Sequence, residues 1–189
     1  PEVGILFEDV VAGDVVDNSV FNCLESGLQG IGIKFDGGGD TIVDNYVDSC
    51  DSGIWFNVDT TVTGNEVTGC EYGLQDYSAA TIECNNIHDN VKGMWIESDS
   101  LVQYNDVKDN TDYGIFVKDD GAVFHYNNIA GNTNFGMQAH SGLAGTVDAT
   151  DNWWGHSTGP FHSSNTGGNG DTVSDGINFG SWETTYLAY

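Results

Sequence analysis

The sequence predicts an all-β protein built as a parallel β-helix, a solenoid of about seven short coils closed by a C-terminal cap. Two short motifs alternate along the chain with a period near 20 residues, and apolar residues inside each motif alternate with a period of two. Turn-forming Gly, Asn, Asp and Ser residues separate the apolar segments. The chain has 189 residues with 26 Gly and only 2 Pro, which suits short strands and tight turns.

The first motif is a glycine followed by Ile, Leu or Met. Its glycines are Gly4, Gly32, Gly53, Gly73, Gly93, Gly114 and Gly136, at intervals of 28, 21, 20, 20, 21 and 22 residues. A unit of this size cannot bury its own apolar face, so each coil is expected to stack on the next. We expect the glycine to supply a positive φ at a corner of the coil.

The second motif is Asn-x-(Val/Ile)-x-x-(Cys/Asn). Its asparagines are Asn18, Asn45, Asn65, Asn85, Asn105 and Asn127, and its last positions are Cys23, Cys50, Cys70, Asn90, Asn110 and Asn132. Equivalent residues of adjacent coils should lie about 4.8 Å apart. An inward asparagine column can then form hydrogen bonds along the stack.

The column of Cys23, Cys50 and Cys70 leaves two alternatives open. A disulfide between neighbours is geometrically feasible, because Cα separations of roughly 4.4–6.8 Å are usual for such bonds. Alternatively, the three residues are free buried thiols that act as small apolar groups. Cys84 falls in a different column, beside Gly64 and Tyr104, and has no obvious partner within the chain.

The chain divides into repeats over residues 1–150 and a closing segment of the same domain over residues 151–189. We expect Trp153 and Trp154 to cover the last coil, while a strand at 173–179 and Trp182 pack over that end. The repeat already begins at Gly4, so we expect a removed upstream domain or another subunit to cover the first coil.

Residues 4 to about 182 resemble the right-handed parallel β-helix repeat proteins of pectate-lyase-like architecture. The most specific part is the run from Asp151 to Pro160, which resembles the NWWG…GP closing segment of many bacterial and archaeal secreted or surface proteins. The resemblance implies a right-handed solenoid located outside the cell or on its surface. The architecture also hosts polysaccharide lyases, hydrolases and epimerases.

Catalytic motifs of those enzymes are largely absent. Lyases of this architecture use Arg or Lys as a base, but the chain has no Arg, and its four lysines look scattered. Of the hydrolase motifs only Asp119-Asp120 is present, and the Asp-Pro-His of the epimerases is missing. We therefore expect no catalysis. The candidates for a polysaccharide hydrolase or lyase site would be Glu97, Asp119, Asp120 and His140, with Lys118 beside them.

An outward stripe is the best candidate surface. Its members are Trp55, Gln75, Trp95, Phe116 and Gln138, preceded by Leu6 and Lys34 in the same column. Aromatic rings edged with amides and carboxylates suit sugar rings, and contiguous exposed aromatic residues also mark protein interfaces. Self-association or contact with other surface-protein subunits, polysaccharide binding, and cover by a loop remain open.

The charge is strongly negative, with 29 Asp plus Glu against 4 Lys and a formal net charge of −25. Nucleic acid and anionic lipid are therefore poor partners, and no apolar run reaches the roughly 18 residues that membrane insertion requires. A high-salt habitat, divalent-cation binding or simple solubility would each explain the acidity. Calcium could bind at the acidic turns, whose candidate ligands are Asp36, Asp40, Asp119 and Asp120.

Asp76 departs from the pattern. It occupies an inward column otherwise filled by apolar side chains, such as Phe56 and Ile96. Because an unpaired buried carboxylate is costly, we expect a local bulge to turn Asp76 outward.

These observations favour a non-catalytic extracellular solenoid with a structural role, as a sheath, surface-layer or fibre subunit. The alternative is a polysaccharide-binding or polysaccharide-processing module that uses the outward stripe.

Overall fold

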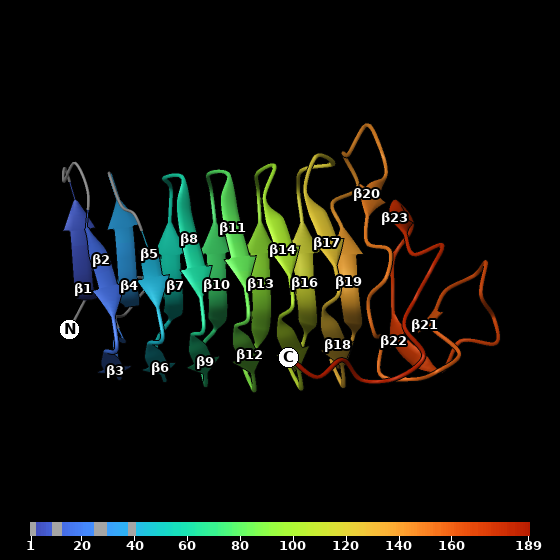
Figure 1. The fold of residues 1–189 in the computed structure, drawn as a ribbon, viewed down its shortest axis with the longest axis horizontal. Coiled ribbons are helices and arrows are strands. Elements are labelled where there is room, and N and C mark those ends of the chain that lie inside the picture. Colours follow the sequence, from blue (N-terminus) through green and yellow to red (C-terminus); the bar gives the residue numbers. More distant parts are fainter. Residues whose placement is uncertain (1–2, 9–12, 25–29, 38–40) are drawn as a thin grey trace.

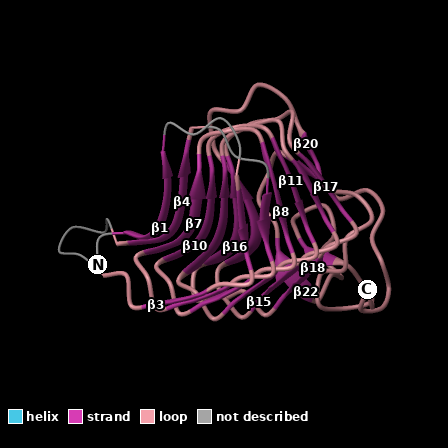
Figure 2. Ribbon diagram, turned by 60° about the vertical axis from the view of Figure 1, so that its left-hand side comes forward, coloured by secondary structure: helices cyan, strands magenta, loops and turns pink. Residues whose placement is uncertain are grey.

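The computed structural model describes residues 3–8, 13–24, 30–37 and 41–189. These residues form strands and no helix, and most strands belong to three parallel sheets that wind as a solenoid (Figure 1). Figure 2 shows the strands of each sheet stacked one behind another along the solenoid. The predicted all-β parallel solenoid is confirmed. None of the described segments is a helix long and apolar enough to cross a membrane.

Sheet A contains seven parallel strands, one from each coil. They are β1 (Val3–Glu8), β4 (Ile31–Asp36), β7 (Ser52–Phe56), β10 (Tyr72–Asp76), β13 (Lys92–Ile96), β16 (Tyr113–Val117) and β19 (Phe135–Ala139). Adjacent strands pair in register, so the Gly-(Ile/Leu/Met) motifs align across the sheet.

Sheets B and C complete the coils. Sheet B contains β2 (Asp14–Val16), β5 (Thr41–Val43), β8 (Thr60–Thr63), β11 (Ala80–Glu83), β14 (Leu101–Gln103), β17 (Val123–His125), β20 (Val147–Asp148) and β23 (Ile177–Asn178). Sheet C contains β3 (Ser19–Phe21), β6 (Tyr46–Asp48), β9 (Glu66–Thr68), β12 (Asn86–His88), β15 (Asp106–Lys108) and β18 (Asn128–Ala130). A small fourth sheet pairs β21 (Pro160–Phe161) with β22 (Gly170–Thr172).

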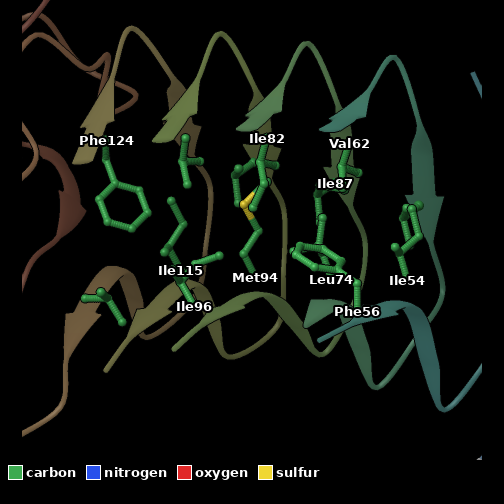
Figure 3. Packing of buried hydrophobic residues seen from close by; sticks show 14 of the residues in the cluster. Ile54, Phe56, Val62, Leu74, Ile82, Ile87, Met94, Ile96, Ile115 and Phe124 are labelled. Atoms are coloured by element: carbon green, nitrogen blue, oxygen red, sulfur yellow. The ribbon is translucent and has the colours of Figure 1, made fainter. Parts of the chain in front are cut away.

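The core is a set of apolar columns between the three sheets (Figure 3). Ile54, Leu74, Met94 and Ile115 form one column on sheet A, and each is fully buried. A side chain in such a column packs against its equivalents in the coils before and after it. Each coil therefore depends on its neighbours for burial, as the period predicted.

The asparagine ladder is confirmed and runs the length of the solenoid. In each step the Oδ1 atom of one asparagine accepts hydrogen bonds from the backbone N–H and the Nδ2 of the asparagine one coil earlier, as between Asn65 and Asn85 at 2.9 Å each. The closing segment supplies the last member, because Oδ1 of Asn152 accepts from the backbone N–H of Asn127 at 2.8 Å. The ladder consists of Asn18, Asn45, Asn65, Asn85, Asn105, Asn127 and Asn152.

A second internal ladder continues the cysteine column. The backbone N–H of Cys70 donates to Oδ1 of Asn90 at 2.9 Å, and the pattern continues through Asn110 and Asn132. It ends on Asp171 of the closing segment, whose Oδ2 accepts the backbone N–H of Asn132 at 2.9 Å. All four cysteines are free thiols, so the disulfide alternative is not realised.

The expected role of the recurring glycines is wrong. The structure gives no positive φ at these positions; instead, a Cβ on Gly73 would lie 2.6 Å from the carbonyl oxygen of Gly93 in the next coil. Glycine is therefore needed here for close approach of the coils. Within the repeats, the residue immediately before each ladder residue has a positive φ, as at Cys84 before Asn85 and Asp89 before Asn90.

The closing segment covers the last coil. Trp154 is fully buried in the core, and β23 pairs with β20, which extends sheet B. Trp182 packs against the core, and a Cβ on Gly159 would lie 2.5 Å from its ring. The strand expected over 173–179 is shorter, at Ile177–Asn178. The C-terminal tail then runs back along sheet C, where Leu187 exchanges two hydrogen bonds with Asn128 (Figure 1).

The expectation for Asp76 is also wrong. No bulge turns it outward: Asp76 pairs in register with Phe56 and Ile96 and is completely buried. The carboxylate is tolerated because it accepts hydrogen bonds from the hydroxyls of Ser98 at 2.8 Å and Ser100 at 2.6 Å and from the backbone N–H of Ser78 at 3.0 Å.

Candidate functional site

The predicted stripe forms one continuous row on the outer side of sheet A. The register places Trp55, Gln75 and Trp95 beside one another on β7, β10 and β13, and Phe116 and Gln138 continue the row on β16 and β19. All five side chains are half-buried. We call this row, together with the outward residues on either side of it, the aromatic face.

The rings of the aromatic face contact one another along the solenoid. Trp95 and Phe116 are stacked, with ring centroids 4.6 Å apart and an angle of 26° between their planes. Trp55 lies 5.5 Å from Tyr77, and Phe116 lies 5.5 Å from Tyr113. The first two contacts join adjacent coils, whereas Tyr113 and Phe116 lie on the same strand, β16, so the rings support one another both along the solenoid and within a coil.

Three of the four lysines lie on this face, so the expectation that the lysines are scattered is wrong. Nζ of Lys34 lies 5.1 Å from the ring centroid of Trp55. Nζ of Lys92 lies 4.2 Å from the ring centroid of Tyr72. Nζ of Lys118 lies 5.3 Å from the ring centroid of Trp95. Each also pairs with a carboxylate at 2.6–2.8 Å. A cation beside an aromatic ring is attracted by the ring's quadrupole. These contacts fix the orientation of the aromatic rings.

The hydrogen-bonding groups of Glu97 and Gln75 on this face are also occupied. Oε1 of Glu97 accepts from Nε1 of Trp95 and from Nζ of Lys118, both at 2.6 Å. Oε1 of Gln75 accepts from the hydroxyl of Ser52 at 2.7 Å, while its Nε2 donates to the hydroxyl of Tyr77 at 3.3 Å. The face is thus an internally bonded surface.

Comparison with known proteins agrees with this architecture. The family model of the right-handed β-helix region matches residues 3–153, which is most of the chain. The chain belongs to the right-handed β-helix family. Neither the curated proteins nor the solved structures contain a match to it.

The candidate catalytic residues of this β-helix are only partly brought together. Glu97 is held by Trp95 and Lys118, whereas Oδ1 of Asp119 accepts the backbone N–H of Gly121 in its own turn at 2.8 Å. Nδ1 of His140 accepts the backbone N–H of Gly142 at 3.1 Å. Asp120 is exposed. The hydrogen bonds of Asp119 and His140 thus stay within their own turns, whereas that between Glu97 and Lys118 joins adjacent coils.

The candidate calcium ligands fall into two groups. Asp36 is engaged by Lys34 at 2.7 Å and by Nδ2 of Asn57 at 2.7 Å, and these two partners lower the pKa of Asp36. Asp40 lies outside the described residues. The Asp119 carboxylate lies close enough to Asp99 to raise the pKa of Asp99 through hydrogen bonding and charge repulsion. Within the described ranges, no three His, Cys, Asp or Glu side chains are arranged to hold a metal ion.

Sequence reasoning missed one column of the aromatic face. Tyr72, Lys92, Tyr113 and Phe135 directly precede the recurring glycines, and the register aligns Tyr72 with Lys92 and Tyr113 with Phe135. Tyr113 is almost fully buried, and its hydroxyl lacks a hydrogen-bond partner among the described residues. Burial raises the pKa of this hydroxyl. The recurrence of a large side chain before the last four recurring glycines was the signal available in the sequence.

Proposed function

We propose that this β-helix is a non-catalytic extracellular structural protein, such as a subunit of a sheath, surface layer or fibre. The observation that carries the proposal is the internal bonding of the aromatic face. Glu97 and the three lysines of the face are engaged with partners in the same chain. A general acid or base needs access to the proton of a substrate, and these groups instead fix the shape of a rigid surface.

The acidity of the chain shapes how such a subunit would assemble. At a net charge of −25, copies repel one another at low ionic strength. Salt at 0.1 M shortens the range of that repulsion to about 10 Å, and divalent cations neutralise carboxylates directly. Assembly through the partly apolar aromatic face is therefore expected only in salt or with divalent cations.

Electron microscopy with light scattering on the native protein tests this proposal. The protein is examined at low salt, at high salt, with calcium, and with calcium followed by a chelator. Ordered fibres or sheets at high salt or with calcium support a structural role. A monomer under all four conditions contradicts it.

Polysaccharide binding is the second candidate function, and the exposed position of the Tyr77 ring favours it. Its side chain is 38% exposed and lies 5.5 Å from the ring of Trp55, next to the amide of Gln75. An exposed ring beside amide and carboxylate groups can pack against the apolar face of a sugar while polar neighbours bond its hydroxyls.

Double substitution of Trp55→Ala and Trp95→Ala distinguishes the two functions. A structural role predicts weaker self-association and unchanged retention on glycan supports, and polysaccharide binding predicts the reverse. Phe21→Ala is the matched control, because Phe21 is 48% exposed on sheet C, away from the aromatic face. It should leave both readouts unchanged.

A further inference from the structure

Two tyrosines occupy unusual backbone conformations at the corner between sheets B and C. Tyr104 and Tyr126 have φ angles of 58° and 56°, in the left-handed region that bulky side chains rarely adopt. The equivalent corner positions of other coils include Asp44, Gly64 and Asp151, residue types that tolerate this region. Because a bulky residue is held in such a conformation at a cost, these positions indicate a role for the two rings themselves.

The two rings and a third from the C-terminal tail form an exposed aromatic surface. Tyr104 and Tyr126 are stacked, with ring centroids 5.6 Å apart and an angle of 9° between their planes. Tyr189 of the tail meets Tyr104 edge-on at 5.6 Å, and its hydroxyl donates to the carbonyl oxygen of Tyr126 at 2.5 Å. Tyr126 is 38% exposed and Tyr189 is 58% exposed. We call these three residues the corner tyrosines.

A hollow of about 210 Å³ lies beside the corner tyrosines. Its wall consists of Cys84, Asn85, Asn86, Tyr104, Asp106 and Tyr189. The hollow opens to solvent, because Cys84 and Tyr189 are both exposed. Sites for drug-sized ligands usually have roughly 300–1,000 Å³. This smaller space therefore suits a single ring.

The polar groups of the wall favour a neutral ligand that carries hydroxyl groups. Oδ1 of Asp106 accepts from Nδ2 of Asn128 at 2.7 Å, and Oδ2 of Asp106 accepts from the hydroxyl of Tyr186 at 2.5 Å. Because both of its oxygens have donors, Asp106 needs no cationic partner, and the net charge of −25 repels anions. Oδ1 of Asn86 is buried without a hydrogen-bond partner among the described residues, which leaves one acceptor of this wall unsatisfied.

We propose that the corner tyrosines and the hollow beside them bind one ring of a neutral glycan. The apolar C–H face of a sugar packs against an exposed tyrosine ring, while its hydroxyl groups exchange hydrogen bonds with tyrosine hydroxyls and with the partly exposed amide of Asn86. The tail supplies Tyr189, so the site is complete only when the tail is docked on sheet C. The site goes beyond a structural role, because it lies away from sheet A and shares no residue with the aromatic face.

Cys84 provides a readout of the occupancy of this hollow. It is an exposed thiol in the wall, whereas Cys23, Cys50 and Cys70 are buried. Ellman's reagent converts the Cys84 thiolate to a mixed disulfide and releases a coloured thiolate, so the reaction rate is followed by absorbance. The full chain is assayed with neutral hexasaccharides of glucose, mannose, xylose and N-acetylglucosamine. At least one of them should slow the reaction in a saturable way, and the concentration dependence gives its Kd.

The variants are Tyr104→Asn and Tyr189→Ala, with Tyr77→Ala as the matched control. Asparagine tolerates a positive φ, so Tyr104→Asn removes the ring without straining the backbone, and thermal melting verifies that each variant folds. Both corner variants should raise the Kd by more than about 10-fold, as truncation of a central aromatic anchor does. Tyr77 is 38% exposed on the aromatic face, so its removal should leave the Kd unchanged.

Three outcomes overturn the proposal. They are a native protein that none of the hexasaccharides protects, an unchanged Kd in the corner variants, and an equal loss of affinity in Tyr77→Ala. The double variant of Trp55→Ala and Trp95→Ala should keep the Kd of the native protein, which separates this site from glycan binding on the aromatic face.

Discussion

Oδ2 of Asp171 occupies the position that the next asparagine of the second ladder would hold. It lies 2.9 Å from the backbone nitrogen of Asn132 and 2.8 Å from Nδ2 of the same residue. Oδ1 of Asp171 accepts the backbone N–H of Gly131 at 2.9 Å. The closing segment thus satisfies the last donors of the ladder with a single carboxylate, much as Asn152 does for the first ladder.

Substitution of Asp171 should therefore destabilise the end of the solenoid. Asp171→Asn places an amide NH₂ against one of three N–H donors and should lower the free energy of unfolding by about 1 kcal/mol, because that donor loses its acceptor. Asp171→Ala leaves all three donors without an acceptor and should cost more. Urea denaturation measures both. Asp175→Asn is the control, because its side chain is 99% exposed, and an equal loss there would contradict the role assigned to Asp171.

The recurring glycines should tolerate no side chain. A Cβ on Gly73 would lie 2.6 Å from the carbonyl oxygen of Gly93 and 2.8 Å from Cγ2 of Ile87. Gly73→Ala should thus separate adjacent coils and lower the free energy of unfolding by about 1–3 kcal/mol or more. Gly167→Ala, where a Cβ meets nothing within 4 Å, should change it little. Similar losses in the two variants would show that backbone freedom, and not close approach, explains the Gly73 requirement.

The first ladder should reject a carboxylate at its centre. Nδ2 of Asn85 donates to the carbonyl oxygen of Val62 at 2.9 Å and to Oδ1 of Asn105 at 3.0 Å. The same Nδ2 also donates to the carbonyl oxygen of Glu83 at 3.0 Å. Asn85→Asp replaces this donor with an acceptor, so a buried charge faces three oxygens, and we expect a loss of more than about 3 kcal/mol at neutral pH. Asn169→Asp at an exposed position is the control. Thermal melting checks both, and equal melting temperatures would contradict the ladder's contribution.

The sequence predicted what repeats from coil to coil, because a repeat constrains every member at once. The asparagine column followed from its spacing, and the outward row of Trp55 and Trp95 followed from the alternation. The role of Gly73 was misjudged because a glycine is required both where φ is positive and where another backbone approaches closely. The residue type alone does not distinguish these two requirements. Only coordinates show the backbone of Gly93 pressed against it.

Single departures from the repeat were harder to interpret. The burial of Asp76 depends on Ser98 and Ser100, which lie 22 and 24 residues later and fit no motif. The gathering of Lys34, Lys92 and Lys118 depends on three different columns that share one face of sheet A. Such contacts depend on which particular side chains face one another in adjacent coils. The periodicity of the sequence therefore does not predict them.

The buried carboxyl of Asp76 should make stability depend on pH. Burial raises its pKa to about 6 from an ordinary value of 3.8, and the charge of Glu97 adds to that increase, while hydrogen bonds from Ser98, Ser100 and Ser78 oppose it. The folded state then binds the proton more tightly than the unfolded state. The contribution of this group to stability is therefore fully present below pH 4 and is lost as the pH rises towards 6 and above.

Asp76→Asn isolates this effect, because asparagine cannot ionise but retains an oxygen for the serine hydroxyls. A pKa difference of two units corresponds to at most about 3 kcal/mol. The stability of the variant relative to the wild type should therefore increase by up to that amount between pH 4 and pH 7. Urea unfolding of both proteins at pH 4, 5, 6 and 7 measures the difference between their free energies of unfolding. The other carboxylates contribute equally to both proteins and so do not affect this difference. A difference that stays constant over this range would mean that Asp76 does not titrate there.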